Sequence, residues 1–445
     1  MKKAILILIL ASGKLVSIDQ ERSIAVQINK TKKVKVINEK TMIAALDIGK
    51  TAHYAYFRAP NGKDIKPFPF YNFRKGFHEF WTKLCQFKRE NKLEDIVVGF
   101  ESSGPYAEPL FHYLRKKPVK LVQINPMHSK RVKELTGNSP NKTDKKDPRV
   151  IADVISLGHA LTLVVPEGPA AQLRRLSQAR ERALKRRTAA INQLQDLIFI
   201  IFPEFLTIMK NVSTKTAFYL IKKYPAPESI VALGIESLAM IVKRVSRGKL
   251  KQQRAEELFN AAQNSIGVSE GKRSILLEVE YLISQIGADN RFIVNLEKQM
   301  EDYLEKIPYS YNLLSIKGIG RVSVAGLIGE VGDFKKFNTI AEIMKLAGLD
   351  LYEISSGKHK GQRRISKRGR SLMRKLLFFA SINTVKSNGI MHEPYQQMLS
   401  RGMLKMKALI AISRKLLRIA FALARDDTVY VDNYSEIHDR FKLAA

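Results

Sequence analysis

The sequence predicts an α/β domain, then a long helical segment, then a mainly helical carboxy-terminal domain. Short apolar runs alternate with helical patterns at first, two long helical patterns follow, and short glycine-bounded helices come last. A chain of 445 residues can form about two to four domains, each with its own core. The predicted divisions are an extension outside the fold (1–41), the α/β domain (42–160), a helical stalk with an insert (161–308), the carboxy-terminal domain (309–430) and a tail (431–445).

The charge of the chain indicates its class of partner. Lysine and arginine number 76 against 42 acidic residues, which gives a net charge of +34 and a pI near 10.0. Such an excess, spread over several segments, is typical of nucleic-acid-binding proteins. Cys85 is the only cysteine, so the composition excludes a disulfide framework and cysteine zinc sites.

The first 41 residues differ in composition from the α/β domain. Lys2, Lys3 and the apolar run 4–11 imitate a short secretory signal, but a polar, basic stretch comes after them. Met42 directly precedes an apolar strand run, so we expect residues 1–41 to be an extension that an upstream start codon would add. No segment has the length and hydrophobicity of a transmembrane helix, and we expect a cytoplasmic protein without membrane contact.

The α/β domain is predicted from alternating strand and helix patterns. These apolar strands and amphipathic helices favour a mixed sheet with helices on its faces. The predicted strands are Met42–Leu46, Ala52–Arg58, Ile96–Phe100 and Val119–Ile124, and the predicted helices are Phe77–Arg89, Tyr106–Leu114 and Pro148–Ile155.

Carboxylates stand at the ends of these elements. Asp47 and Glu101 each close a strand, and active sites of open α/β sheets form at the carboxyl ends of strands. If the helix after Pro148 reaches back to Asp144, then Asp144 and Asp147 share one face. Four convergent carboxylates could hold two Mg²⁺ ions about 4 Å apart for phosphodiester cleavage. Lys142 beside them suits a metal that is shared with a nucleic-acid phosphate.

Other interpretations of these residues stay open. Asp144 and Asp147 could complement a helix dipole and pair with neighbouring lysines, Asp47 could cap a turn, and Glu101 could be a surface acid. The stretch 47–51 also fits the phosphate loop of actin-like sugar kinases. That class requires a second phosphate loop and a glycine-rich adenosine loop, which the sequence lacks, and its members are seldom so basic.

The order of these motifs resembles a known family. Asp47-Ile48-Gly49, Glu101-Ser102-Ser103-Gly104 and Asn141-Lys142-Thr143-Asp144 with Asp147 are similar to the RuvC-like nuclease domain of the DEDD transposases. This insertion-sequence family, called one-ten with its eleven-eleven branch, includes the Piv-type DNA invertases. The resemblance implies a ribonuclease-H-like fold in which Asp47, Glu101, Asp144 and Asp147 bind Mg²⁺ and are catalytic.

Two long helical patterns predict the stalk. The first, Ala171–Phe202, carries many arginines and ends at Pro203, and the second, Lys272–Ile307, has apolar residues near heptad spacing. Shorter helical pieces lie between them. We expect an antiparallel helical or coiled-coil stalk that could form an oligomer interface. Whether the basic face of the first helix is merely solvated, tracks nucleic acid or dimerises is open.

The carboxy-terminal domain begins with glycine-rich turns. The run 316–320, Ile-Lys-Gly-Ile-Gly, leads into a helix at Val322–Gly329, and another helix follows at Ile340–Ala347. Such turns can offer backbone N–H groups to phosphates in the helix-hairpin-helix mode, or can simply be tight connections.

A strongly basic segment comes next in the chain. From Ser356 to Lys375 there are nine lysines and arginines and no acid, which indicates a polyanionic partner. Ser355-Ser356-Gly357 is a turn sequence that could also present a serine to a phosphodiester. The candidate phosphate clamps are Arg363, Arg364, Lys367 and Arg374.

This segment resembles the carboxy-terminal transposase domain of the same family. The similarity rests on Gly348-Leu349, Ser356-Gly357 and the run 365–369, and it implies that Ser356 is a covalent nucleophile. Leu351 and Arg370 depart from the family pattern, where proline and asparagine are usual.

The resemblance implies the transposase of a bacterial insertion sequence, a site-specific recombinase that exchanges DNA strands through a phosphoserine intermediate. It also implies donor and target DNA, an element-encoded bridge RNA and a homo-oligomer, a dimer or tetramer. The alternatives are a Holliday-junction-type Mg²⁺-dependent nuclease with water as nucleophile, and a basic DNA- or RNA-binding scaffold.

Overall fold

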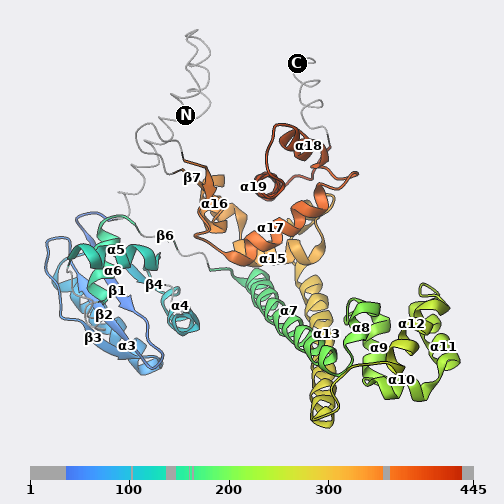
Figure 1. Ribbon diagram of the computed structural model, residues 1–445. Helices are drawn as coiled ribbons and strands as arrows, with labels where there is room; N and C mark the ends of the chain where they lie inside the picture. Colours follow the sequence, from blue (N-terminus) through green and yellow to red (C-terminus); the bar gives the residue numbers. More distant parts are fainter. Residues whose placement is uncertain are drawn as a thin grey trace, which may run out of the picture. The chain divides into compact units, whose positions relative to one another are not determined.

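The structure is a computed structural model that describes residues 37–101, 104–136, 147–159, 161–162, 165–353 and 361–432. It consists of two compact units, which are divided between Val164 and Val165. Figure 1 shows the sheet of the first unit in blue and teal, and the helices of the second from green to red.

The first unit contains a mixed sheet with the strand order β3-β2-β1-β4-β5-β6. β4 and β5 run parallel to β1, whereas β2, β3 and β6 are each antiparallel to the neighbour nearer the centre. This arrangement is consistent with a ribonuclease-H-like domain. The strands are β1 (Thr41–Asp47), β2 (Ala52–Arg58), β3 (Phe68–Tyr71), β4 (Asp95–Glu101), β5 (Lys120–Ile124) and β6 (Leu161–Thr162).

The four predicted strands are confirmed, and two short edge strands were missed. β3 contains Pro69, which weakens a strand signal because proline cannot donate to a ladder. It is tolerated because β3 is the edge of the sheet. β6 has only two residues, too few for any periodicity.

Helices cover both faces of the sheet, which explains why its central strands are apolar throughout. Met42, Ala44 and Leu46 of β1 face the core built with α3 and α4, while Ile43 and Ala45 face α6. Gly99 of β4 allows α6 to approach, because a Cβ there would lie 2.3 Å from the Ile155 side chain. The helices of this unit are α3 (Arg74–Glu90), η1 (Gly104–Ala107), α4 (Glu108–Leu114), α5 (Pro126–Thr136) and α6 (Asp147–Ser156).

The fold begins before the predicted boundary at Met42. Ile37 packs against the α6-side core, and Thr41 is buried as the first residue of β1. The Asn38 backbone N–H donates to Thr41 Oγ1, and the Lys40 carbonyl accepts from the Glu94 N–H at 2.9 Å. Residues 37–40 therefore lead into the sheet, a feature that their mostly polar composition does not reveal.

Two truncations test this boundary. A chain that begins at Met42 should be roughly 2 kcal/mol less stable than one that begins with a methionine added before Ile37, because each lost hydrogen bond contributes about 1 kcal/mol. Trp81, the only tryptophan, lies on α3, so its fluorescence in urea reports unfolding of this unit. Equal urea midpoints for the two proteins would place the boundary at Met42.

Two long helices, α7 (Gly168–Ile201) and α13 (Lys272–Leu304), pack along each other in the second unit. The spacing of the apolar side chains predicted both within three residues at each end. Pro203 limits α7, since it begins the next helix, and Gly271 precedes α13 with a φ of +72°. Val279, Leu282, Ile286 and Ile293 are buried along α13.

Arginines of α7 hold this helix pair together. Arg180 Nε lies 2.7 Å from Glu297 Oε1, and Arg186 Nη2 lies 2.6 Å from Asp289 Oδ1 on the buried side of α13. Since the residue number rises along α7 as it falls along α13, the helices are antiparallel, as predicted. These arginines belong to a cross-helix contact, a role that was not among the three interpretations of the basic face.

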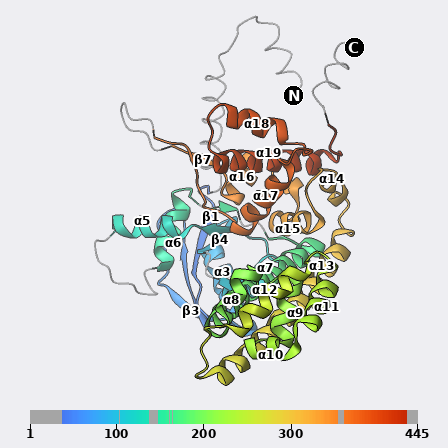
Figure 2. The ribbon, with the colours of Figure 1, turned by 45° about the vertical axis from the view of Figure 1, so that its right-hand side comes forward.

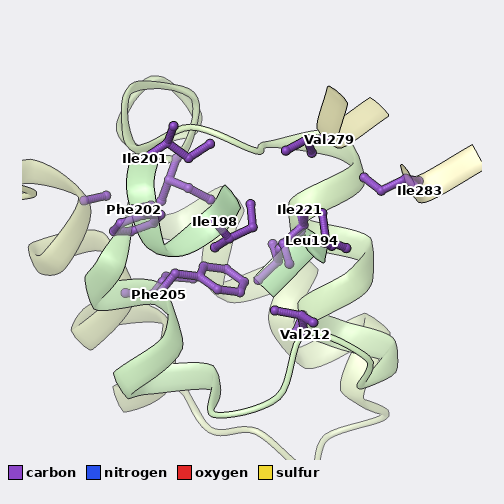
Figure 3. Packing of buried hydrophobic residues seen from close by; sticks show 14 of the residues in the cluster. Leu194, Ile198, Ile201, Phe202, Phe205, Val212, Ile221, Val279 and Ile283 are labelled. Carbon is purple, nitrogen blue, oxygen red and sulfur yellow. The ribbon is translucent and has the colours of Figure 1, made fainter. Parts of the chain in front are cut away.

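The insert forms its own core with the facing ends of α7 and α13. Figure 3 shows Leu194, Ile198, Phe205 and Ile221, four fully buried side chains of this core. The insert helices are α8 (Pro203–Met209), α9 (Lys215–Lys223), α10 (Pro227–Leu233), α11 (Ile235–Ser246) and α12 (Gln252–Gln263).

The carboxy-terminal helices pack at the other end of α7. Gly329 of α15 approaches so closely that a Cβ would lie 2.6 Å from the Arg174 backbone nitrogen. Figure 2 shows α17 beside α19, which pack together. The elements are α14 (Ser310–Leu314), α15 (Arg321–Val331), η2 (Phe334–Lys336), α16 (Ile340–Ala347), β7 (Leu351–Tyr352), β8 (Arg364–Ile365), α17 (Ser371–Thr384), α18 (His392–Ser400) and α19 (Lys405–Asp426).

Within the described ranges, no helix combines the length and the hydrophobicity that crossing a bilayer would require.

Candidate functional site

Asp47 and Glu101 lie at the same end of the sheet, where the central strands β1 and β4 finish, and on the same face. β1 and β4 are parallel neighbours with Leu46 opposite Phe100, so each acid is the next residue beyond that pair. Side chains alternate along strands, and Ala45 and Val97 face α6. Asp47 and Glu101, two and four residues further on, therefore also point to the α6 side.

The direction of α6 places its first residue at this end of the sheet. The Arg149 guanidinium lies 5.6 Å from the centroid of the Tyr56 ring, and Asp153 Oδ1 lies 2.6 Å from Arg58 Nη1. Tyr56 pairs with Ala45 and Arg58 with Ile43, so residue numbers rise along α6 as they fall along β1. The amino-terminal end of α6, where Asp147 lies, points toward the carboxyl end of β1.

Asp147 forms an ion pair with Lys133 of α5, and its side chain is only 15% exposed. The alternative in which Asp147 pairs with a lysine is thus realised, although the partner comes from another helix. The ion pair joins α5 to the first residue of α6.

The described acids do not form a complete metal site by themselves. Across the described ranges, no three histidine, cysteine, aspartate or glutamate side chains are arranged to hold a metal ion. Asp144, the fourth predicted acid, and Lys142 lie outside the described residues. The carboxylates of Asp47 and Glu101, which lie on one face at one end of the sheet, are hard oxygen donors that fit a divalent cation of the Mg²⁺ type. The predicted set also includes Asp144, which the structure does not describe.

The predicted serine also lies outside the described residues, but both of its flanks are described. Leu351 pairs with Ile365 and Tyr352 with Arg364 in a two-stranded ladder. Next to this ladder, Arg363 Nε lies 2.8 Å from Glu353 Oε2. The hairpin therefore pairs described residues from before and after positions 354–360, the stretch of the sequence that contains Ser356.

The predicted clamp residues fall into two groups. Arg363, Arg364 and Lys367 are exposed. Arg374 instead donates from Nη1 to the carbonyls of Ala347 and Gly369, at 2.9 and 3.0 Å. Its guanidinium joins the end of α16 to the turn before α17, so its role as a phosphate clamp remains a prediction.

The two sequence blocks of the carboxy-terminal domain meet in space. Ser366 donates from its backbone N–H to the Asp350 carbonyl at 2.9 Å, and from its hydroxyl to the Asp350 carboxylate. The Lys367 N–H donates to the Gly348 carbonyl at 3.0 Å, with Lys367 in the left-handed region at a φ of +55°. The exposed lysine is thus held on a well-defined turn.

Arg370, which departs from the family pattern, is largely buried. Its Nε lies 3.7 Å from Glu330 Oε2. Burial, together with the neighbouring Arg174, lowers the pKa of Arg370 to about 10. Glu330 was missed at the sequence level. Its signal is a single acid within the otherwise apolar stretch 324–331 of α15.

Known proteins match this chain in both units. A family model of the IS110 DEDD type, described as "Transposase", matches residues 44–203. A second, described as "Transposase IS116/IS110/IS902 family", matches residues 310–396. The first match contains all four predicted acids, and the second contains Ser356 and the basic segment.

Relatives span most of the chain. It is 24% identical to the 43.6 kDa protein of insertion element IS110 from Streptomyces coelicolor, over 86% of this chain and 94% of the relative. It is 22% identical to the 44.8 kDa protein of insertion element IS116 from Streptomyces clavuligerus, over 65% of this chain and 72% of the relative. The 42 kDa protein of insertion element IS900 from Mycobacterium paratuberculosis is 23% identical over 65% of this chain and 73% of its own length.

Proposed function

The chain belongs to the IS110/IS116 family of insertion-element transposases, and on that basis we propose that it cuts and rejoins DNA through metal-binding acids and a serine nucleophile. The observation that carries this proposal is the placement of Asp47, Glu101 and Asp147 toward one end of one sheet face. Acids at the carboxyl ends of neighbouring parallel strands are well placed for catalysis.

The acids would hold a divalent cation, Mg²⁺ in the first instance. Asp47, Glu101, Asp144 and Asp147 are its ligands in this proposal, and the bound cation supplies positive charge that polarises the scissile phosphate. The packing of α6 on the sheet and the ion pair with Lys133 hold Asp147 toward the two strand ends.

Ser356 supplies the nucleophile. Its hydroxyl oxygen bonds to phosphorus, its proton passes to solvent, and the displaced DNA oxygen leaves as a hydroxyl after taking up a proton. The phosphodiester energy is retained in the serine–phosphate bond, so a DNA hydroxyl can reverse the step and rejoin a strand. Arg363, Arg364 and Lys367 are exposed and can hold the phosphate during attack.

The partners in this proposal are donor DNA, target DNA and an element-encoded bridge RNA, bound by a homo-oligomer. The charge of +34 supports nucleic-acid binding. The apolar stripe of α13 is satisfied by α7, so an oligomer contact would use other surfaces of the stalk.

The test uses the purified full-length chain with RNA transcribed from the element and a plasmid that carries the element with its flanking DNA. We expect strand cleavage with Mg²⁺ and none with EDTA. Binding to the plasmid with no cleavage in Mg²⁺ or Mn²⁺ would contradict the proposal and support a binding scaffold. Cleavage that leaves no protein on the DNA would support the water-using nuclease.

A further inference from the structure

We propose that Asn72 is a positioning residue that ties the connection after Asp47 to the helical turn η1, which begins three residues after Glu101. The inference rests on the proposed metal-dependent cleavage. It concerns how the strand ends are held in place, and Asn72 itself is not a ligand. The two strands are neighbours, but the chain diverges after them, to β2 in one case and to η1 in the other.

The side chain of Asn72 contacts both segments. Its Nδ2 lies 3.2 Å from the Tyr106 carbonyl oxygen and 3.5 Å from the Lys50 carbonyl oxygen. Tyr106 belongs to η1, the element after Glu101, and Lys50 belongs to the short connection after Asp47. One nitrogen atom thus links the segment beyond one acid to the segment beyond the other.

The backbone of Asn72 adds a third contact. Its N–H donates to the Thr51 carbonyl at 3.0 Å, next to the Lys50 contact. Asn72 is the residue immediately after β3, which pairs with β2 through Tyr71 and Ala52. It is therefore anchored to the sheet from its own side and reaches across to the other two segments.

A side-chain amide suits these two contacts. The Asn side chain carries two N–H donors on one nitrogen, directed away from each other, so it can serve two carbonyl oxygens at once. A serine or threonine hydroxyl has one donor, and an aspartate carboxylate has none.

A buried histidine follows the same connection in the chain. His53 is fully buried beside Phe70, with ring centroids 5.1 Å apart. Burial lowers the pKa of His53, while the adjacent Asn72 side chain and Gly49 backbone act in the opposite direction. The connection after Asp47 is also tight, since a Cβ on Gly49 would lie 2.2 Å from the Ala52 carbonyl oxygen. The close approach of Gly49 to Ala52 and the contact of Asn72 with Lys50 both constrain this turn.

The consequence is a fixed spacing between two metal ligands. Ligand sets work only when held within about 0.5 Å of the productive geometry by supporting residues. The β1–β4 ladder reaches only to Leu46 and Phe100, so the Asn72 side chain adds a link beyond the last pair. The expected effect of removing this link is weaker cation binding, and with it slower cleavage.

The experiment measures Mn²⁺ binding by electron paramagnetic resonance, and cleavage in parallel, on the full-length chain. The acid site is defined as the Mn²⁺ binding that Asp47→Asn removes. Asn72→Leu keeps the shape and removes both donors, and we expect about tenfold weaker binding at that site. Asn72→Gln keeps two donors on a longer arm and should recover part of this loss.

Asn91→Leu is the matched control. Asn91 Nδ2 donates to the Phe87 carbonyl at 2.9 Å at the end of α3, so this variant also loses an asparagine-to-backbone bond. Both leucine variants should lower the thermal midpoint read from Trp81, but only Asn72→Leu should change Mn²⁺ affinity. If Asn72→Leu does not fold, Asn72→Ser, with one donor, takes its place and should show a smaller loss.

The outcomes separate the two proposals. If a folded Asn72 variant binds Mn²⁺ and cleaves DNA as well as the wild type does, the role of Asn72 is overturned and the proposed metal site is not. A wild-type chain that binds no Mn²⁺ through Asp47 overturns the metal site, and the inference about Asn72 with it. An equal loss of affinity in Asn91→Leu overturns the role of Asn72, because general destabilisation would then account for the effect.

Discussion

Asp47→Asn is expected to reduce Mg²⁺-dependent strand cleavage by roughly 10³-fold, the scale of losing one preorganised electrostatic group. The substitution keeps the shape of the side chain and removes the charge that a hard cation requires. Affinity for DNA and RNA should be unchanged, because every lysine and arginine remains. The measurements are initial cleavage rates and a binding isotherm at fixed salt, since such affinities depend on salt.

Asp153→Asn is the control for this prediction. Asp153 lies on α6 with Asp147, but its carboxylate pairs with Arg58 toward the other end of β1. We expect near-wild-type cleavage and a stability loss of about 1 kcal/mol or less, since the pair is only partly buried. Cleavage at the wild-type rate in Asp47→Asn would remove Asp47 from the site. A matching loss in Asp153→Asn would indicate that displacement of α6 is the cause.

Ser356→Ala is expected to abolish a covalent protein–DNA adduct that wild-type protein forms on a nicked suicide substrate. Serine is a poor nucleophile at its ordinary pKa, so it depends on the cations and on the metal to neutralise the phosphate. The adduct is detected as DNA that migrates with protein on a denaturing gel. Ser355→Ala is the matched variant, because the neighbouring serine could also be presented by a turn, and it should retain the adduct.

Three results would change this assignment. An adduct that survives Ser356→Ala moves the nucleophile to another residue, and loss of the adduct only in Ser355→Ala moves it by one position. Cleavage in wild type without any adduct supports hydrolysis by water. In that case the basic segment around Arg363 and Arg364 would bind phosphate without a covalent step.

The main helices and strands were predictable because local sequence patterns indicate them. The apolar run before Asp47 predicts a strand, and Pro203 predicts the end of the first long helix because its ring fixes φ and removes a donor. The apolar strand runs also predict that Asp47 and Glu101 each stand at the carboxyl end of a strand. The mostly polar residues 37–40 carry no such signal, so the predicted boundary at Met42 leaves them out.

Only the tertiary structure decided which residues meet. The parallel pairing of β1 with β4 sets Asp47 beside Glu101, and the contact of Arg58 with Asp153 sets the direction of α6. The same holds for Arg186 of α7, which reads as part of a basic surface and instead pairs with Asp289. Asn72 has no sequence signal at all. Periodicity reports whether a residue is buried on its own element, whereas a partner distant in the sequence depends on strand register and helix direction, which long-range packing sets.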